Sequence, residues 1–206
     1  MVRQKVERRY AGVSAAQRRS DRRTALLREG RRIWGESGHA AVTVRGVCKA
    51  AGLTDRYFYE HFASREELLV AVADEVRDLL LGTLLQVGLT SPGGPEERLR
   101  AALHALLEVI ATDPHVHHIA AGELSSLPLL LERRRALLAT MAAIVVEYAP
   151  AQLGIEPDPP WLARAALFVA GGLSQLVEAW LDGTLELSTG ELAEHATALI
   201  LRALVP

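Results

Sequence analysis

The sequence is poor in cysteine and in aromatic residues. Its single cysteine, Cys48, rules out a disulfide within the chain and is typical of a protein in a reducing compartment. Phe, Trp and Tyr make up only 5% of the residues, so the core must be built from Leu, Ala and Val, most of which favour helices. We find no segment apolar and long enough to cross a bilayer, and no signal peptide in residues 1–9. These absences predict an all-α cytoplasmic protein that does not bind a membrane.

The sequence also lacks the short motifs that mark common enzyme sites. It has no Gly-rich phosphate loop, no nucleophile elbow and no pair of carboxylates at a plausible site, so we expect neither an enzyme nor a cofactor. Histidine and carboxylate side chains, which are common metal ligands, do cluster at Asp113, His115, His117 and His118. Adjacent histidines without a clear helical i, i+4 pair match known metal-site spacings poorly, so we interpret the cluster as a loop or a helix start and expect no metal.

Positive charge is concentrated at the N-terminal end. Residues 1–65 carry 15 Lys and Arg against 6 Asp and Glu, whereas residues 66–206 carry 8 against 19, and the net charge is -2. This division is expected when the first part of a protein binds a polyanion and the second part does not. A solvated basic tail is the alternative interpretation.

Apolar periodicity and capping residues divide the first third of the chain. Residues 1–19 show little periodicity and are predicted to form a basic flexible arm, whose arginines either enter the minor groove of DNA or remain a screened tail. Residues 20–65 are predicted to form a small helical domain. Its expected helices begin at Ser20, run from Val44 to Ala51 after the N-cap Thr43, and run from Asp55 to Phe62 after the N-cap Thr54.

The remaining residues, 66–206, read as long helices separated by proline and glycine breaks. A capping box at Ser64–Glu67 is predicted to open a helix over about 66–81. Further helices are expected at about 96–111, 129–149, 161–181 and 188–204, with another segment starting at Asp113-Pro114.

Two of the short helices form a candidate DNA-reading unit. They are joined by Ala51-Gly52-Leu53-Thr54, where glycine permits the tight turn of a helix-turn-helix. Phe58 and Phe62 are four residues apart and should pack inward. That leaves Asp55, Arg56, Tyr57, Tyr59 and His61 to be divided between the exposed surface and the edges of the core. An exposed row of this kind suits the major groove, where arginine can pair with guanine. A minor core helix, in which the tyrosines fill volume, is the alternative.

Residues of about 20–75 resemble the DNA-binding domain of the TetR family of bacterial transcriptional regulators. The resemblance rests on the continuous stretch 43–68, and most specifically on Phe-Tyr-x-His-Phe-x-Ser-Arg-x-x-Leu, which ends at Leu68. It implies an N-terminal three-helix helix-turn-helix domain followed by a larger helical domain for ligand binding and dimerisation. It also implies phosphate contacts from Thr43, Arg45, Tyr59, His61 and Arg65, and base contacts from Thr54, Asp55, Arg56 and Tyr57.

Three positions depart from the family pattern. Asp55 and Arg56 stand where many members have a basic residue and glycine, and Tyr57 stands where threonine is frequent. The departures concern which operator sequence is read. Because Asp55 would repel phosphates, we expect it to orient Arg56 or to accept a hydrogen bond from a cytosine amino group.

The last two helices are candidates for a dimer contact. The helix at about 161–181 is apolar on too broad a surface for one-sided burial, and Ala170-Gly171-Gly172 permits close approach of another backbone. Together with about 188–204 it resembles the helix pair through which TetR regulators form a four-helix homodimer interface. The alternative is that these helices only close the core of the monomer.

The body of the chain is expected to hold an inducer. The helices at about 96–111 and 129–149 are rich in small and medium apolar residues, which can surround a cavity, and the family resemblance implies a ligand pocket there. The aromatic residues Tyr148, Trp161 and Phe168 are candidates for its wall, or else belong to the core.

We therefore expect a ligand-responsive transcriptional regulator, a repressor, that binds a palindromic site on double-stranded DNA as a homodimer. A small, apolar inducer in the C-terminal domain would release it. An activator or nucleoid-type binder without an inducer is the alternative within the class. A carrier of hydrophobic ligands and an enzyme are the alternatives outside it.

Overall fold

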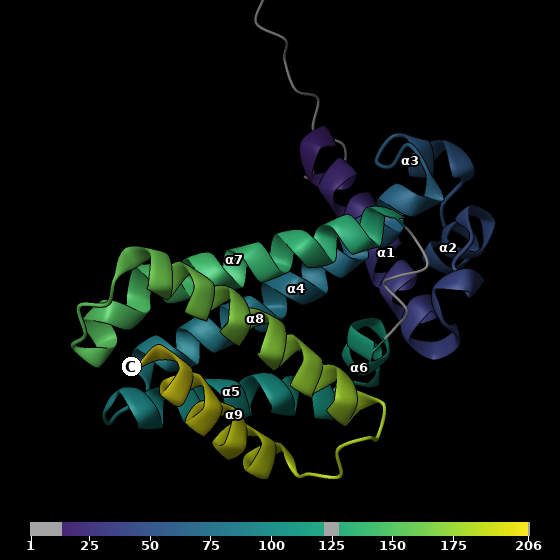
Figure 1. Cartoon of the computed structure of the whole chain (residues 1–206). Coiled ribbons are helices and arrows are strands. Elements are labelled where there is room, and N and C mark those ends of the chain that lie inside the picture. Colours follow the sequence, from purple (N-terminus) through teal and green to yellow (C-terminus); the bar gives the residue numbers. More distant parts are fainter. Residues whose placement is uncertain (1–13, 122–127, 206) are drawn as a thin grey trace, which may run out of the picture. The chain divides into compact units, whose positions relative to one another are not determined.

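The computed structural model describes residues 14–121 and 128–205, and every regular element in these ranges is helical (Figure 1). This confirms the all-α fold class. The chain divides into two compact units, Met1–Val72 and Ala73–Pro206. The helices up to the division are α1 (Ala15–Ser37), a 3-10 turn η1 (His39–Ala41), α2 (Val44–Ala51) and α3 (Asp55–Tyr59). The helices that follow are α4 (Arg65–Thr90), α5 (Pro95–Thr112), α6 (Pro114–Ala121), α7 (Pro128–Leu153), α8 (Pro159–Leu181) and α9 (Thr189–Leu204).

The first helix begins earlier than the apolar pattern predicts. It starts at Ala15, where the hydroxyl of Ser14 accepts a hydrogen bond from the backbone N–H of Gln17 at 3.0 Å. The side chain of Gln17 also donates to Asp21 at 2.8 Å. Such a polar first turn is invisible to hydrophobic periodicity, which detects only the buried part of a helix. The rest of the predicted arm, residues 1–13, lies outside the described residues.

The core of the first unit is built from all of its helices. As predicted, Phe58 and Phe62 point inward and are 0% and 1% exposed. Around them lie fully or almost fully buried side chains from the neighbouring helices: Leu26, Leu27, Trp34, Val47, Cys48, Leu68, Leu69 and Val72. Burying a large apolar side chain stabilises a fold by about 1.5–3 kcal/mol, so this small domain has a core sufficient for its size.

The start of α4 belongs to this first core. A Cβ on Gly30 of α1 would lie 3.3 Å from Leu68 Cδ2 and 3.4 Å from Val72 Cγ2, so glycine allows the two helices to approach closely. The boundary between the units therefore follows Val72, seven residues beyond the predicted boundary at residue 65. Helix α4 also continues past Gly82 to Thr90, because tertiary packing outweighs the low helix propensity of glycine.

In the second unit, α5 packs along α9 and α7 packs along α8 (Figure 1). The α5–α9 contact buries Leu103, Leu107, Leu192 and Ala196. The α7–α8 contact uses small side chains, Ala142, Ala166 and Ala170, with Leu138, Met141 and Val145 packed against them. Small residues at this contact let the two helices approach without displacing the larger side chains beside them.

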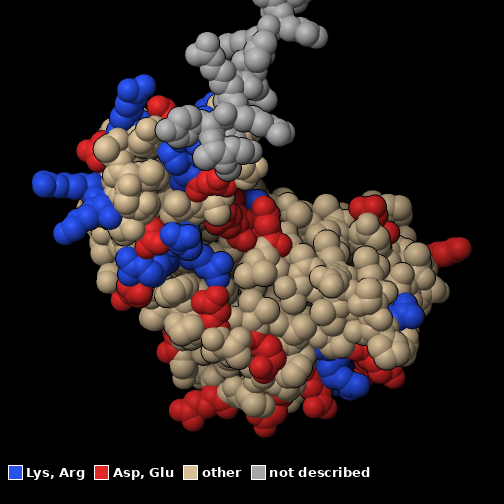
Figure 2. All heavy atoms as spheres, turned by 180° about the vertical axis from the view of Figure 1, so that it is seen from behind, with Lys and Arg blue, Asp and Glu red and all other residues tan. Residues whose placement is uncertain are grey.

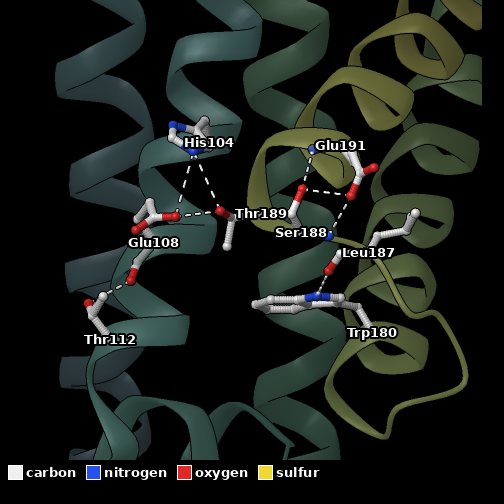
Figure 3. Close-up of polar contacts among 8 residues, drawn as sticks. All are labelled: His104, Glu108, Thr112, Trp180, Leu187, Ser188, Thr189 and Glu191. Carbon is white, nitrogen blue, oxygen red and sulfur yellow. Dashed lines mark hydrogen bonds and ion pairs between the residues drawn. The ribbon is translucent and has the colours of Figure 1, made fainter.

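Polar contacts hold α9 to its neighbours (Figure 3). The Thr189 hydroxyl donates to Glu108 on α5, and Ser188 accepts from the backbone N–H of Glu191 at 3.2 Å, which caps α9. The indole N–H of Trp180 donates to the carbonyl of Leu187 at 2.9 Å and ties the end of α8 to the loop before α9.

Two helices are, by length and composition, apolar enough to cross a membrane: Leu131–Leu153 in α7 and Pro159–Leu181 in α8. The expectation that no segment qualifies is therefore wrong. Some of their apolar side chains pack against each other or line a cavity of the second unit, but only 6% of the apolar stretch in α7 and 28% of that in α8 is buried. One or two helices of this length and composition are weak evidence, so they do not indicate a membrane protein.

Candidate DNA interface and ligand cavity

Helix α2 is bounded at both ends by local backbone contacts. The hydroxyl of Thr43 accepts from the N–H of Gly46 at 3.0 Å, and a Cβ on Gly46 would lie 2.8 Å from that oxygen. At the other end of α2, Gly52 has φ +66°, and the N–H of Leu53 donates to the carbonyl of Cys48 at 2.9 Å. Because left-handed backbone favours glycine, the direction in which α3 leaves the turn is fixed by the sequence.

Helix α3 presents its polar face to solvent. Phe58 anchors the helix in the core, and this orientation leaves the side chain of Arg56 86% exposed and Tyr59 60% exposed. Thr54 occupies the predicted N-cap position but its side chain makes no capping hydrogen bond. Thr43 and Arg45 are also exposed, at the start of α2. The predicted base-reading residues thus lie at the start of α3, and two predicted phosphate contacts, Thr43 and Arg45, lie at the start of α2.

Arginines of α1 pack against α3, which the sequence did not indicate. The guanidinium of Arg22 lies 4.5 Å from the ring centroid of Tyr57, a cation–π contact, and reaches Glu60 at 3.7 Å. Arg19 donates to the carbonyl of Glu60 at 3.2 Å. The part of the predicted basic arm that is described therefore supports α3 directly. Figure 2 shows Lys and Arg side chains prominent over the N-terminal unit, in keeping with the charge division of the sequence.

The structure gives Arg56 and Asp55, two of the three departures from the family pattern, different neighbours. Arg56 forms an ion pair with Glu60 at 3.5 Å, so the partner that the structure gives Arg56 is Glu60 rather than Asp55. Burial, together with the nearby carboxylate of Asp55, raises the pKa of the Cys48 thiol to about 11. Cys48 is a small core residue, 2% exposed, and its thiol stays neutral at physiological pH.

Arg65 and His61 are less open to DNA than the other predicted contacts. Arg65 donates from Nε to the carbonyl of Val42 and from Nη2 to the carbonyl of His39, both at 2.5 Å. These bonds fix the chain just before α2, so Arg65 has a clear structural role. His61 is half-buried, and burial together with the charges of Arg19 and Arg22 lowers the pKa of its imidazole.

The second unit contains a cavity of about 260 Å³. Its described walls come from α4, α5, α6, α7, α8 and α9, and most of the lining side chains are Leu, Ile, Val, Ala and Met. The volume lies slightly below the usual 300–1,000 Å³ of small-molecule sites, so the cavity suits a small ligand. Its walls are mostly apolar.

Four polar residues also line the cavity: Arg77, Arg134, Ser174 and Glu178. Arg134 on α7 makes two parallel hydrogen bonds to Glu178 on α8, of 2.5 and 2.8 Å. Arg77 donates to Asp74 at 2.6 Å and to Asp78 at 2.8 Å. Sequence reasoning missed these residues, because the pairing of Arg134 with Glu178 joins positions 44 residues apart.

The three aromatic residues considered for the pocket lie elsewhere. Phe168 is 73% exposed and Tyr148 is 43% exposed, and neither they nor the half-buried Trp161 line the cavity. Their helices are the expected ones, but these side chains lie on other faces of those helices.

The histidine cluster lies at the start of α6. There Asp113 accepts a hydrogen bond from the backbone N–H of His115 at 2.9 Å, and the ring of His118 contacts the carbonyl of Pro114 at 2.9 Å. The histidine cluster is thus a helix start, as interpreted from its spacing.

Comparisons with known proteins bear on the first unit most directly. A sequence model of the bacterial regulatory proteins of the tetR family matches residues 26–72. The HTH-type transcriptional repressor KstR2 of Mycolicibacterium smegmatis is 30% identical over 112 residues, 53% of this chain and 54% of that protein. The HTH-type transcriptional activator FasR of the same organism is 30% identical over 95 residues, 46% of this chain and 43% of that protein. The chain thus spans about half the length of the curated relatives it matches.

The fold is shared over nearly the whole chain. The fatty acid degradation regulator FadR from Bacillus halodurans superposes with a TM-score of 0.69 at 18% identity, and covers 87% of this chain and 94% of that one. At this identity the likeness concerns the fold alone. The relatives and the fold are those of DNA-binding regulators, which are not enzymes.

Proposed function

Because this chain belongs to the TetR family of bacterial transcriptional regulators, we propose that it represses transcription by binding a palindromic operator as a homodimer. A small apolar molecule that enters the cavity of the second unit releases it from DNA. The observation that carries the proposal is the exposed face of α3. Arg56 and Tyr59 extend from a helix that is held by a buried phenylalanine and by arginines of α1. Such a helix fits the major groove, with Arg56 directed to guanine and Thr43 and Arg45 to phosphates.

A homodimer is supported by the outer faces of α8 and α9. Leu167 and Phe168 on α8 are 59% and 73% exposed, and Leu199 on α9 is 53% exposed. A Cβ on Gly171 or Gly172 would meet no atom within 4 Å, so this stretch of α8 has room for another backbone. Where exposed apolar residues of this size gather on one face, they mark a protein–protein interface. A two-fold axis through them would repeat the recognition helix, which is what a palindromic operator requires.

Ligand response is supported by the continuity of α4. Its residues Leu68, Leu69 and Val72 are buried in the core of the DNA-binding unit, and Ala73, Val76 and Leu80 line the cavity of the second unit. A ligand that binds better to one position of this helix shifts the population toward that position. The release of DNA then reflects a coupling free energy between the two sites. Binding to DNA in the cytoplasm is part of the same proposal.

The operator is tested by selecting bound duplexes from a random DNA pool. The wild type and an Arg56→Ala/Tyr57→Ala variant are compared, with Arg28→Ala on α1 as a control for the loss of one exposed positive charge. We expect the wild type and the control to enrich one palindrome and the double variant to lose it. If the wild type enriches no sequence at low salt, the chain is not a sequence-specific DNA-binding protein and a ligand carrier becomes the better explanation.

The dimer is tested by sedimentation of the full chain. Phe168→Glu introduces a charge into the proposed interface and is expected to yield monomers. Tyr148→Glu places the same charge at an exposed aromatic residue of α7 and is expected to leave the dimer intact. A dimer that survives Phe168→Glu as well as it survives the control would place the interface elsewhere.

A further inference from the structure

The charged groups at the cavity of the second unit are all paired. Of its four polar lining residues, Arg134 and Glu178 bind each other through two hydrogen bonds, and Arg77 is held by Asp74 and Asp78. Asp74 also lies 3.8 Å from Arg133, which brings a third positive charge to the cluster. The cluster therefore contains three arginines, Arg77, Arg133 and Arg134, and three carboxylates, Asp74, Asp78 and Glu178.

We propose that the cavity selects an uncharged ligand, with an apolar body and one hydroxyl or carbonyl group that meets Ser174 beside the Arg134–Glu178 pair. This proposal rests on the proposed function, which it deepens by naming the chemical class of the ligand. An alcohol, a ketone or an ester of about nine or ten non-hydrogen atoms belongs to this class. The cavity of about 260 Å³ corresponds to roughly nine water volumes of about 30 Å³ each.

The reason for the selection is the cost of burying an unpaired charge. An ionised ligand group among these mostly apolar walls loses part of its hydration, and an opposite charge of the protein must compensate that loss. The side chains of Arg134 and Glu178 stay 29% and 38% exposed, which reduces the cost without removing it. Both members of the Arg134–Glu178 pair are already compensated, and their mutual hydrogen bonds lower the pKa of Glu178, so both remain ionised at neutral pH. A carboxylate could bind Arg134 only by displacing Glu178, which would leave that glutamate without its partner.

An uncharged polar group avoids this cost. Ser174 lies four residues before Glu178 on α8, so the two side chains share one face of the helix, and both line the cavity. A hydroxyl both donates and accepts hydrogen bonds, and Ser174 can therefore meet either an alcohol or a carbonyl. Apart from these groups and Arg77, which is paired with Asp74 and Asp78, the walls offer apolar contacts, which favour a hydrocarbon body that fits the volume.

The test compares three probes that share one tail: 1-octanol, octanoate and octylammonium. Their binding to the full-length protein at pH 7.5 is measured by isothermal titration calorimetry. We expect 1-octanol to bind at least about tenfold more tightly than either ion, because one uncompensated charge costs far more than one unmade hydrogen bond. If octanoate or octylammonium binds as tightly as 1-octanol, or more tightly, the proposal is refuted.

Two substitutions reverse the selection in opposite directions. Glu178→Gln leaves the charge of Arg134 uncompensated, so octanoate is expected to gain about tenfold relative to 1-octanol. Arg134→Gln leaves Glu178 uncompensated, so octylammonium is expected to gain by a similar factor. Glu147→Gln on the exposed surface of α7 is the control, and it should leave the order of the probes unchanged.

A general loss of stability cannot produce these opposite shifts, and the order of the three probes on the wild type decides the question even if both variants fail to fold. The same experiment separates this proposal from the proposed function. If octanoate binds best and releases the operator DNA, the ligand response stands and only the selection of an uncharged ligand falls. If none of the three probes binds, both the selection and the apolar inducer are refuted.

Discussion

Replacing Arg65 with glutamine separates two roles that the structure and the family resemblance assign to this residue. The resemblance makes Arg65 a phosphate contact. In the structure its guanidinium is bonded to the carbonyls of Val42 and His39, and its side chain is only 25% exposed. These carbonyls lie just before the N-cap of α2, so Arg65 connects the start of α4 to the start of the helix-turn-helix.

The size of the expected loss of stability follows from those two hydrogen bonds. A hydrogen bond to a charged group contributes about 1.5–3 kcal/mol, and two such bonds would contribute roughly twice that. Because a quarter of the side chain is exposed, water can replace part of the loss, and we expect Arg65→Gln to lower the free energy of unfolding by about 2–3 kcal/mol. For a chain of this length, each kcal/mol corresponds to about 2–4 °C in Tm, so the expected loss is roughly 4–12 °C.

The assay has two readouts, thermal unfolding followed by circular dichroism and the salt dependence of DNA binding. We expect Arg65→Gln to reduce Tm and to leave the slope of log affinity against log salt unchanged. Arg45→Gln is the matched control, since Arg45 is an exposed residue of the helix-turn-helix. Arg45→Gln should leave the free energy of unfolding within about 0.5 kcal/mol of the wild-type value. It should reduce the slope of log affinity against log salt by about 0.9 per protomer. An Arg65→Gln protein that keeps its Tm but loses that much slope would show that Arg65 binds phosphate and that its carbonyl contacts contribute little.

Further predictions concern the backbone, a cap and the buried thiol. Gly52→Ala is expected to destabilise the protein by about 1–2 kcal/mol, because the backbone φ at Gly52 is +66°. Gly82→Ala inside α4 should instead stabilise the protein by about 0.5–1 kcal/mol, because alanine favours a helix more than glycine does. Urea unfolding measures both changes, and equal effects of the two substitutions would contradict this backbone argument. Ser188→Ala removes the acceptor that caps α9 and should cost about 1 kcal/mol in the same assay, with Ser188→Asp retaining most of the stability. Because the pKa of Cys48 is raised from 9.0 to about 11, the unfolded chain loses this proton first, so the thiol's contribution to stability is complete below pH 9 and is lost as the pH rises to 11. The loss of stability between pH 8.5 and 10.5 should thus be smaller in Cys48→Ala than in the wild type, and an identical loss would show that the thiol titrates normally in the folded state.

The sequence alone determined the helix-turn-helix and the order of the helices. The information for these features is local: Thr43 caps α2, Gly52 ends it in a left-handed conformation, and Phe58 and Phe62 lie one helical turn apart. Capping and glycine geometry depend on residues within a few positions, so they can be read from the chain directly. The exposed face of α3 followed from the same local pattern, since burying Phe58 directs Arg56 and Tyr59 outward.

Only the tertiary structure decided which side chains line the cavity and how its charges are arranged. Apolar periodicity predicted the helices of the second unit, but these helices are apolar on more than one face. Phe168 and Val169 are adjacent in the sequence, yet the first is 73% exposed and the second lines the cavity. The pairing of Arg134 with Glu178 joins two helices and depends on their rotation and separation, which are fixed by the packing of Ala142 against Ala166 and Ala170. Contacts between residues distant in sequence arise from the packing of whole helices, and no local pattern encodes them.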